Sequence, residues 1–207
     1  VHGRLSANSA TRLSAVSAPP SAGRLRRSTR PSSPSRISDV GGTGSATSRA
    51  EEPEVAFSTE ARQYLVVWQA DDPDAGLADN EAEIFAQRLS FNGGALGAND
   101  FRVSSMGPDG DSRYQATKPA VAWSPSGNEY LVVWEGDEAD DEDEIYGQRL
   151  SGASAAAVGA DDFRVSDMGP DGNVAFDAQN PEAAANPRAA EPGSGPARLA
   201  EPEASVA

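Results

Sequence analysis

The pentapeptide Tyr-Leu-Val-Val-Trp occurs twice in this chain of 207 residues, at 64–68 and at 130–134. Each copy lies within a larger frame that also recurs. The segments RISDVGGTG, RVSSMGPDG and RVSDMGPDG begin at Arg36, Arg102 and Arg164, with spacings of 66 and 62 residues. The difference in spacing falls mostly after the tryptophan, as expected of a surface loop between fixed elements. The chain is therefore a tandem repeat.

Each repeat contains four short segments that are typical of β-strands. A proline opens the first, as a strand-starting or edge position tolerates, and the second is the β-branched and aromatic run around YLVVW. Turn-forming residues separate the segments. They span 53–58, 63–69, 83–90 and 99–105 in the first repeat, and 119–124, 129–135, 144–151 and 161–167 in the second.

The second segment is apolar on both faces, with Tyr64, Val66 and Trp68 on one face and Leu65 and Val67 on the other. Such a strand must be covered on both sides, so a single four-stranded meander cannot bury it. Copies must stack on one another. Radial stacking gives a β-propeller, and a linear solenoid is the competing arrangement. We expect an all-β fold of two tandem four-stranded antiparallel meanders that resemble propeller blades.

The frame P-x-V-A…EYLVVW…EI-[FY]-x-Q-R-L…DFRVS-x-MGPDG resembles a repeat found in multiple copies in large bacterial secreted and surface proteins. It is also similar to repeats of RTX-like exoproteins that are interpreted as β-propeller blades. The resemblance covers about 36–187 and carries no catalytic residues. It implies an extracellular or cell-surface repeat module. Because the chain holds two complete repeats and the start of a third, we expect a fragment of a larger repeat protein.

Composition divides the chain further. The formal net charge is −15, yet residues 1–49 hold eight arginines and one acid. The arm could bind nucleic acid or phosphate, but its Ser, Ala, Arg and Pro content favours a solvated disordered linker. We therefore expect no nucleic-acid partner, and no apolar run reaches the length of a membrane span. The predicted segments are a disordered arm (1–35), repeat 1 (36–101), repeat 2 (102–163), a truncated third repeat (164–187) and a disordered tail (188–207).

Residue types exclude several catalytic sites. The chain has no cysteine and a single histidine, His2. A disulfide, a thiolate metal site, a Ser-His-Asp triad and a histidine zinc site are thereby excluded within it. No pair of carboxylates stands out as a glycosidase acid and base. The sequence predicts a non-enzymatic protein.

Acidic residues raise the question of calcium. Seven carboxylates lie between Asp137 and Glu144, and calcium takes several such oxygens. The alternative, which we favour, is a solubilising loop that protects strand edges. The PDGD and PDGN turns are a second metal candidate, but the first repeat has Thr43 and Ser45 at the positions of two of their aspartates, which favours plain β-turns. The candidate ligands for Ca²⁺ are Asp109, Asp111, Asp137, Asp140, Asp141, Asp143, Asp171, Asn173 and Asp177.

The remaining recurrent residues indicate packing. Trp68 and Trp134 end equivalent segments, which suggests contacts between repeats. We expect Arg88 and Arg149, on a largely apolar face, to pair with an acid or a carbonyl of the same or the adjacent repeat. The predicted function is a scaffold or interaction surface for neighbouring repeats and an unidentified protein or glycan. A calcium-binding module is the alternative, and a carbohydrate-binding or hydrolysing propeller rests on fold analogy alone.

Overall fold

The structure, a computed structural model, describes residues 36–41, 48–138 and 141–185. The predicted arm (1–35) and tail (188–207) lie outside the described residues, as does Asp140 of the acidic run. Within the described residues, two short 3-10 helices accompany the strands. They are η1 (Pro73–Ala75) and η2 (Val174–Phe176).

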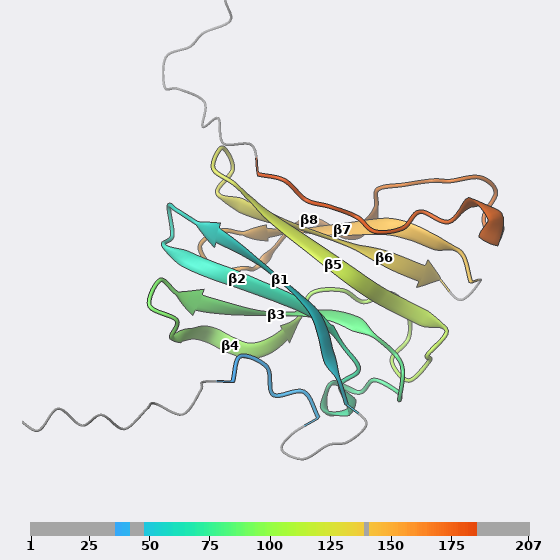
Figure 1. The fold of residues 1–207 in the computed structure, drawn as a ribbon, viewed down its shortest axis with the longest axis horizontal. Coiled ribbons are helices and arrows are strands. Elements are labelled where there is room, and N and C mark those ends of the chain that lie inside the picture. The colour runs from blue at the N-terminus through green and yellow to red at the C-terminus, as the bar shows by residue number, and fades with distance from the viewer. Residues whose placement is uncertain (1–35, 42–47, 139–140, 186–207) are drawn as a thin grey trace, which may run out of the picture. The chain divides into compact units, whose positions relative to one another are not determined.

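Eight strands in this part of the chain form two antiparallel sheets of four strands each (Figure 1). Every strand pairs with the next one along the chain, so each sheet is a meander. Sheet A consists of β1 (Ala50–Ser58), β2 (Gln63–Ala70), β3 (Glu83–Ser90) and β4 (Ala95–Arg102). Sheet B consists of β5 (Tyr114–Ser124), β6 (Glu129–Glu138), β7 (Asp143–Ser151) and β8 (Ala157–Arg164). The predicted all-β fold and its two tandem four-stranded meanders are confirmed.

The fourth strand of each sheet differs from the prediction. β4 and β8 begin four residues earlier than predicted and end at Arg102 and Arg164. Their first halves are mostly exposed and contain glycines at φ +77° (Gly97) and +84° (Gly159), beside register shifts in the pairing with β3 and β7. These irregular, exposed halves lack the apolar alternation that would reveal a strand in the sequence.

The first strands also differ, because the prolines lie inside β1 and β5 and not at their starts. The pairing shifts register around Pro53 and Pro119, and the preceding residue, Glu52 or Lys118, has a φ of +50°. A β-bulge at this point accommodates a residue that cannot donate a hydrogen bond to the sheet.

The main core lies between the two sheets, which use opposite faces of their equivalent strands. Sheet A contributes the side of β2 that carries Leu65 and Val67, and both side chains are fully buried. Sheet B contributes the side of β6 that carries Tyr130, Val132 and Trp134, which are also fully buried. Leu65 is equivalent to Leu131, which is the neighbour of Tyr130 along β6, so Leu65 and Tyr130 lie on opposite faces of equivalent strands. The front face of one sheet therefore packs on the back face of the other.

A second, smaller core covers the other face of sheet A. It joins Trp68 and Phe85 to Leu77 of the β2–β3 connection and to Val40 of the segment that precedes β1. The apolar residues on both faces of β2 are therefore largely covered, as the sequence pattern requires.

Candidate functional site: the junctions between repeats

The segment that follows the fourth strand crosses from one repeat to the next. We call its three copies connector 1 (36–41), connector 2 (102–107) and connector 3 (164–169). Connector 2 leaves the β4 pairing and turns back onto the start of β3. There Val103 N donates to Ile84 O at 2.7 Å, and Ser104 Oγ accepts from Ile84 N at 2.7 Å.

Glu83, the first residue of β3, is the centre of the resulting polar network. Its side chain is 1% exposed and accepts hydrogen bonds from Arg102 Nη2 at 2.5 Å, Met106 N at 3.0 Å and Ser104 Oγ. Burial raises the pKa of Glu83, against the opposing effect of Ser104 and Arg102. A buried carboxylate needs donors of this kind to remain ionised.

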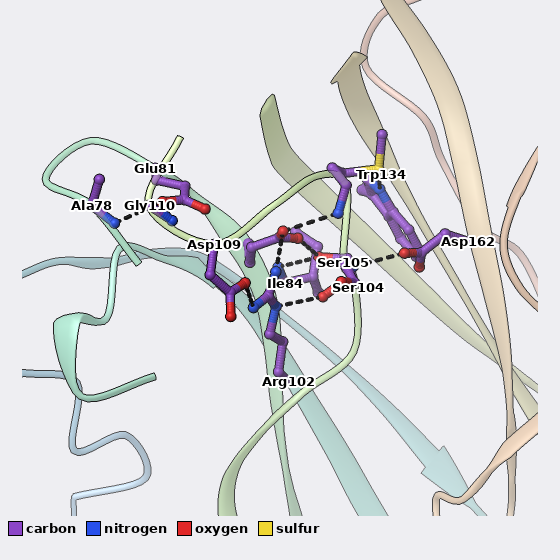
Figure 2. A network of polar contacts seen from close by, with 12 residues as sticks. Ala78, Glu81, Ile84, Arg102, Ser104, Ser105, Asp109, Gly110, Trp134 and Asp162 are labelled. Carbon is purple, nitrogen blue, oxygen red and sulfur yellow. Dashed lines mark hydrogen bonds and ion pairs between the residues drawn. The ribbon is translucent and has the colours of Figure 1, made fainter. Parts of the chain in front are cut away.

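The Gly-Pro-Asp-Gly turn (107–110) is held by Arg102 of the same network and by Glu81 (Figure 2). Arg102 also reaches Asp109 Oδ1 at 2.5 Å, and Glu81 Oε2 accepts from Gly110 N at 2.8 Å and from Ala78 N at 2.7 Å. Gly107 is required here, because a Cβ at that position would lie 2.2 Å from Tyr114 Cγ. The turn is thus a structural part of the junction.

Two further contacts tie connector 2 to sheet B. Ser105 N donates to Asp162 Oδ2 at 2.7 Å, and both residues are labelled in Figure 2. Trp134 Nε1 donates to Met106 Sδ at 3.4 Å. Burial raises the pKa of Asp162 to about 6, although the Ser105 amide opposes the shift. Connector 2 is therefore anchored on sheet A and received by sheet B.

Connector 3 repeats the anchoring residue for residue. Glu144 accepts from Arg164 Nη2 at 2.7 Å, from Met168 N at 2.5 Å and from Ser166 Oγ. Arg164 reaches Asp171 at 3.0 Å, as Arg102 reaches Asp109. The recurrence shows that the network belongs to each repeat.

Connector 1 makes the contacts with sheet A that connector 2 makes with sheet B. Asp39 N donates to Asp100 Oδ2, which is the counterpart of the bond between Ser105 and Asp162. Val40 packs in the cluster of Trp68, as Met106 packs beside Trp134. Connector 1 is thus received by sheet A.

The start of the third repeat lies on sheet B as β5 lies on sheet A. Ala178 N donates to Asp143 O at 2.7 Å, and the equivalent Ala116 N donates to Ala82 O at 2.8 Å. Asn180 N donates to Glu135 Oε1, where the second repeat has Lys118 N and Gln69 Oε1 at 2.8 Å. The junction geometry is thus partly present at a third position.

The aspartates of the PDGD and PDGN turns, predicted as candidate metal ligands, are engaged by arginines. Asp109 pairs with Arg102 and Asp171 with Arg164, while Asp111 pairs with Arg113 at 2.5 Å. An arginine that faces a carboxylate at this distance supplies the positive charge that a cation would bring.

The acidic run spans the hairpin between β6 and β7. Asp137 and Glu138 are the last two residues of β6 and Asp143 begins β7, and Asp137 and Asp143 are cross-strand partners. Asp141 is exposed with a φ of +60°. The carboxylates at both ends of the run therefore lie in a hairpin, where Glu142 and Glu144 turn inward to hold connector 3 and its turn.

The last candidates lie beside this hairpin. Asp177 Oδ1 accepts from Asp143 N at 3.4 Å, and Gln179 donates to Asp143 Oδ2 at 3.0 Å. Asn173 caps η2 by accepting from Ala175 N at 3.2 Å. Asp137, Asp143 and Asp177 are therefore neighbours, but no group of three acidic, histidine or cysteine side chains among the described residues is arranged to hold a metal.

The arginines of the QRL motif pair as predicted. Arg88 Nη1 donates to Ala153 O of the β7–β8 turn at 2.7 Å, and Arg149 pairs with Glu129 at 2.6 Å. Nearby, Tyr130 Oη donates to Gln63 O at 3.1 Å, and burial raises the pKa of Tyr130 to about 12. The Arg88 and Tyr130 contacts join the two sheets at the end of the interface opposite the connectors, whereas the Arg149–Glu129 pair lies within sheet B.

Sequence reasoning missed the acids that hold the junctions. Glu81 and Glu142 fall in the predicted loops, and Glu83 and Glu144 begin the predicted third strands without a partner being assigned to them. The signal was present, because Glu-x-Glu-Ile precedes the QRL motif in both repeats and always accompanies Arg-Val-Ser-x-Met. An acid that recurs 19 or 20 residues before a recurring arginine predicts an ion pair.

Comparison with models of known families, with curated proteins and with solved structures finds no match for this chain. No helix in the described ranges is long and apolar enough to cross a membrane.

Proposed function

We propose that the chain is a non-enzymatic extracellular repeat module whose sheets stack as β-propeller blades and serve as a scaffold or interaction surface. The observation that carries the proposal is the junction itself. Each connector is anchored by its own repeat and shaped to be received by the next, which is how an array of like sheets is held in register.

A second feature favours radial over linear stacking. Three equivalent prolines, Pro53, Pro119 and Pro181, line one hollow together with the residue ahead of each. Those preceding residues share a left-handed backbone, with φ between +50° and +55°. Inner strands that converge on one hollow are expected of blades around an axis, whereas a linear stack would keep them in a row.

The proposal is non-enzymatic because the most buried carboxylates are occupied in holding the fold together. Glu83 and Glu144 each accept from an arginine, a serine and a backbone amide. A general acid or base must instead be free to exchange a proton with a substrate. The extracellular location rests on the repeat resemblance.

Calcium binding remains the alternative, and one observation favours it. The pKa of Asp143 is raised, first by burial and then by the like charges of Glu135 and Asp177. A divalent cation beside Asp143 would relieve that repulsion.

Thermal unfolding of the full chain, followed by circular dichroism with millimolar calcium and with EDTA, separates the two. A scaffold gives one cooperative transition that is the same in both. A calcium module unfolds at a higher temperature with calcium, because a ligand of the native state stabilises it. Asp143→Asn would abolish that increase, while Asp79→Asn, in the β2–β3 connection, would leave it intact.

A further inference from the structure

Each outer face of the two sheets is equivalent to one of the two faces that are buried between sheet A and sheet B. The outer face of sheet A includes Val55 and Phe57, which are 57% and 37% exposed. Their equivalents in sheet B, Val121 and Trp123, are only 8% and 9% exposed because sheet A covers them. The outer face of sheet A thus has the residues of a covered face without the cover.

The outer face of sheet B is the matching half. Leu131 is 39% exposed, while its equivalent Leu65 is fully buried against sheet B. In connector 3, Val165 and Met168 are 56% and 47% exposed. Their equivalents in connector 2 are each 8% exposed. The missing cover is the face of a following sheet.

An unsatisfied polar atom marks the same place from the other side. Trp68 Nε1 is buried and has no hydrogen-bond partner among the residues that the structure describes. The equivalent Trp134 Nε1 donates to the sulfur of Met106, but connector 1 has Val40 at that position and valine has no acceptor. A buried donor of this kind is costly when it is left unpaired.

Connector 3 has the contacts with a preceding sheet, and connector 1 has the contacts with a following sheet. Connector 3 is fixed to its own sheet by Glu144 and presents Met168 outward. Connector 1 is received by sheet A, through Asp100 and Asp72, and its Arg36–Asp39 pair is more than half exposed. Connector 3 therefore has the anchor, and connector 1 occupies the receiving site.

We propose that two copies of this chain associate head to tail, with sheet B of one copy on the outer face of sheet A of the next. Connector 3 of the first copy displaces connector 1 of the second and brings Met168 Sδ to Trp68 Nε1. The inference rests on the stacked-sheet function proposed above. Because the faces differ, the contact is heterologous, and repetition closes a ring or extends a filament.

The test uses two charged substitutions in the full chain, Val55→Glu on sheet A and Leu131→Glu on sheet B. Sedimentation velocity over a range of concentrations measures the assembly. The native chain is expected to assemble, and each variant alone to sediment as a monomer. An equimolar mixture is expected to give a dimer and nothing larger, because one intact face remains on each variant. Ser126→Glu adds the same charge at an exposed turn and leaves assembly unchanged.

A second variant tests the displaced connector. Met168→Ala is expected to weaken association on the order of tenfold, as truncation of a central interface residue does. It should also abolish the change in tryptophan emission that accompanies assembly of the native chain. Equal association of Met168→Ala and the native chain would overturn the connector exchange.

The outcomes separate this inference from the proposed function. A native chain that unfolds cooperatively but stays monomeric at every concentration overturns self-association alone and assigns both faces to other chains. A dimer that Val55→Glu leaves intact overturns the head-to-tail arrangement. A native chain without a cooperative transition overturns the stacked scaffold as well.

Discussion

Connector 2 and connector 3 make the same hydrogen bonds to their own sheets. Among the described residues, a following sheet covers connector 2 but not connector 3. Met106 is 8% exposed and Met168 is 47% exposed. The pKa of Glu83 is raised because burial outweighs its hydrogen bonds. At Glu144 burial also acts upward, but hydrogen bonds from Ser166, Met168 and Arg164 outweigh it and lower the pKa. The polar network is thus built by one repeat alone, while the neighbouring repeat supplies its apolar cover.

The largest expected effect comes from removing the acid at the covered junction. Glu83→Ala leaves Arg102, Ser104 and the Met106 amide without their acceptor, and we expect a loss of about 3–4 kcal/mol in unfolding free energy. Glu144→Ala removes the same bonds beside better solvated partners, and we expect about 1–2 kcal/mol. Urea unfolding at pH 7 measures both. Equal losses would mean that the cover has no influence on the network.

Truncation of Met106 and of Met168 tests whether the neighbouring repeat supplies the apolar cover of the connector. Met106→Ala opens a space beside Trp134 in the core between the sheets, and we expect a loss of about 2–3 kcal/mol. Met168→Ala truncates an exposed side chain and should change stability by less than about 0.5 kcal/mol in the monomer. Thermal unfolding at low protein concentration gives both values. A large loss for Met168→Ala would show that the outer face is already covered.

The strands could be predicted from the sequence because their apolar residues recur in register. YLVVW and the QRL motif located β2, β3, β6 and β7 closely. The first halves of β4 and β8 could not be found, since ALGA and AVGA are exposed and have no period. The burial of Glu83 could not be predicted either, because it depends on a connector that begins 19 residues later, at Arg102, and folds back over β3. A dense acidic run looks like a solvated loop until its arginine partner is placed.

A smaller effect is expected from pH at the aspartate that receives connector 2. The folded pKa of Asp162 is about 6, above the ordinary 3.8, so folding favours its protonated form. Its contribution to stability is therefore fully present below about pH 4 and is lost as the pH rises through about 6. Relative to the native chain, Asp162→Asn should gain on the order of 1–2 kcal/mol between these pH values.

The measurement is the difference in unfolding free energy between Asp162→Asn and the native chain from pH 4 to pH 7. Asp161→Asn, at the exposed neighbouring position, should reduce the pH dependence without removing it, because the charge of Asp161 is a lesser cause of the raised pKa of Asp162. A flat difference for Asp162→Asn would mean that the aspartate is not desolvated where connector 2 meets sheet B.

The smallest expected effect comes from giving connector 1 the methionine that connector 2 has at the equivalent position. Val40→Met places a sulfur where Trp68 Nε1 lacks an acceptor, and we expect a gain of about 0.5–1 kcal/mol in unfolding free energy. The same change should weaken head-to-tail association, since a better-held connector 1 is harder to displace. Val40→Leu adds bulk without a sulfur and controls for packing. A gain from leucine equal to that from methionine would show that Trp68 responds to volume, and the hydrogen-bond account of the exchange would then fail.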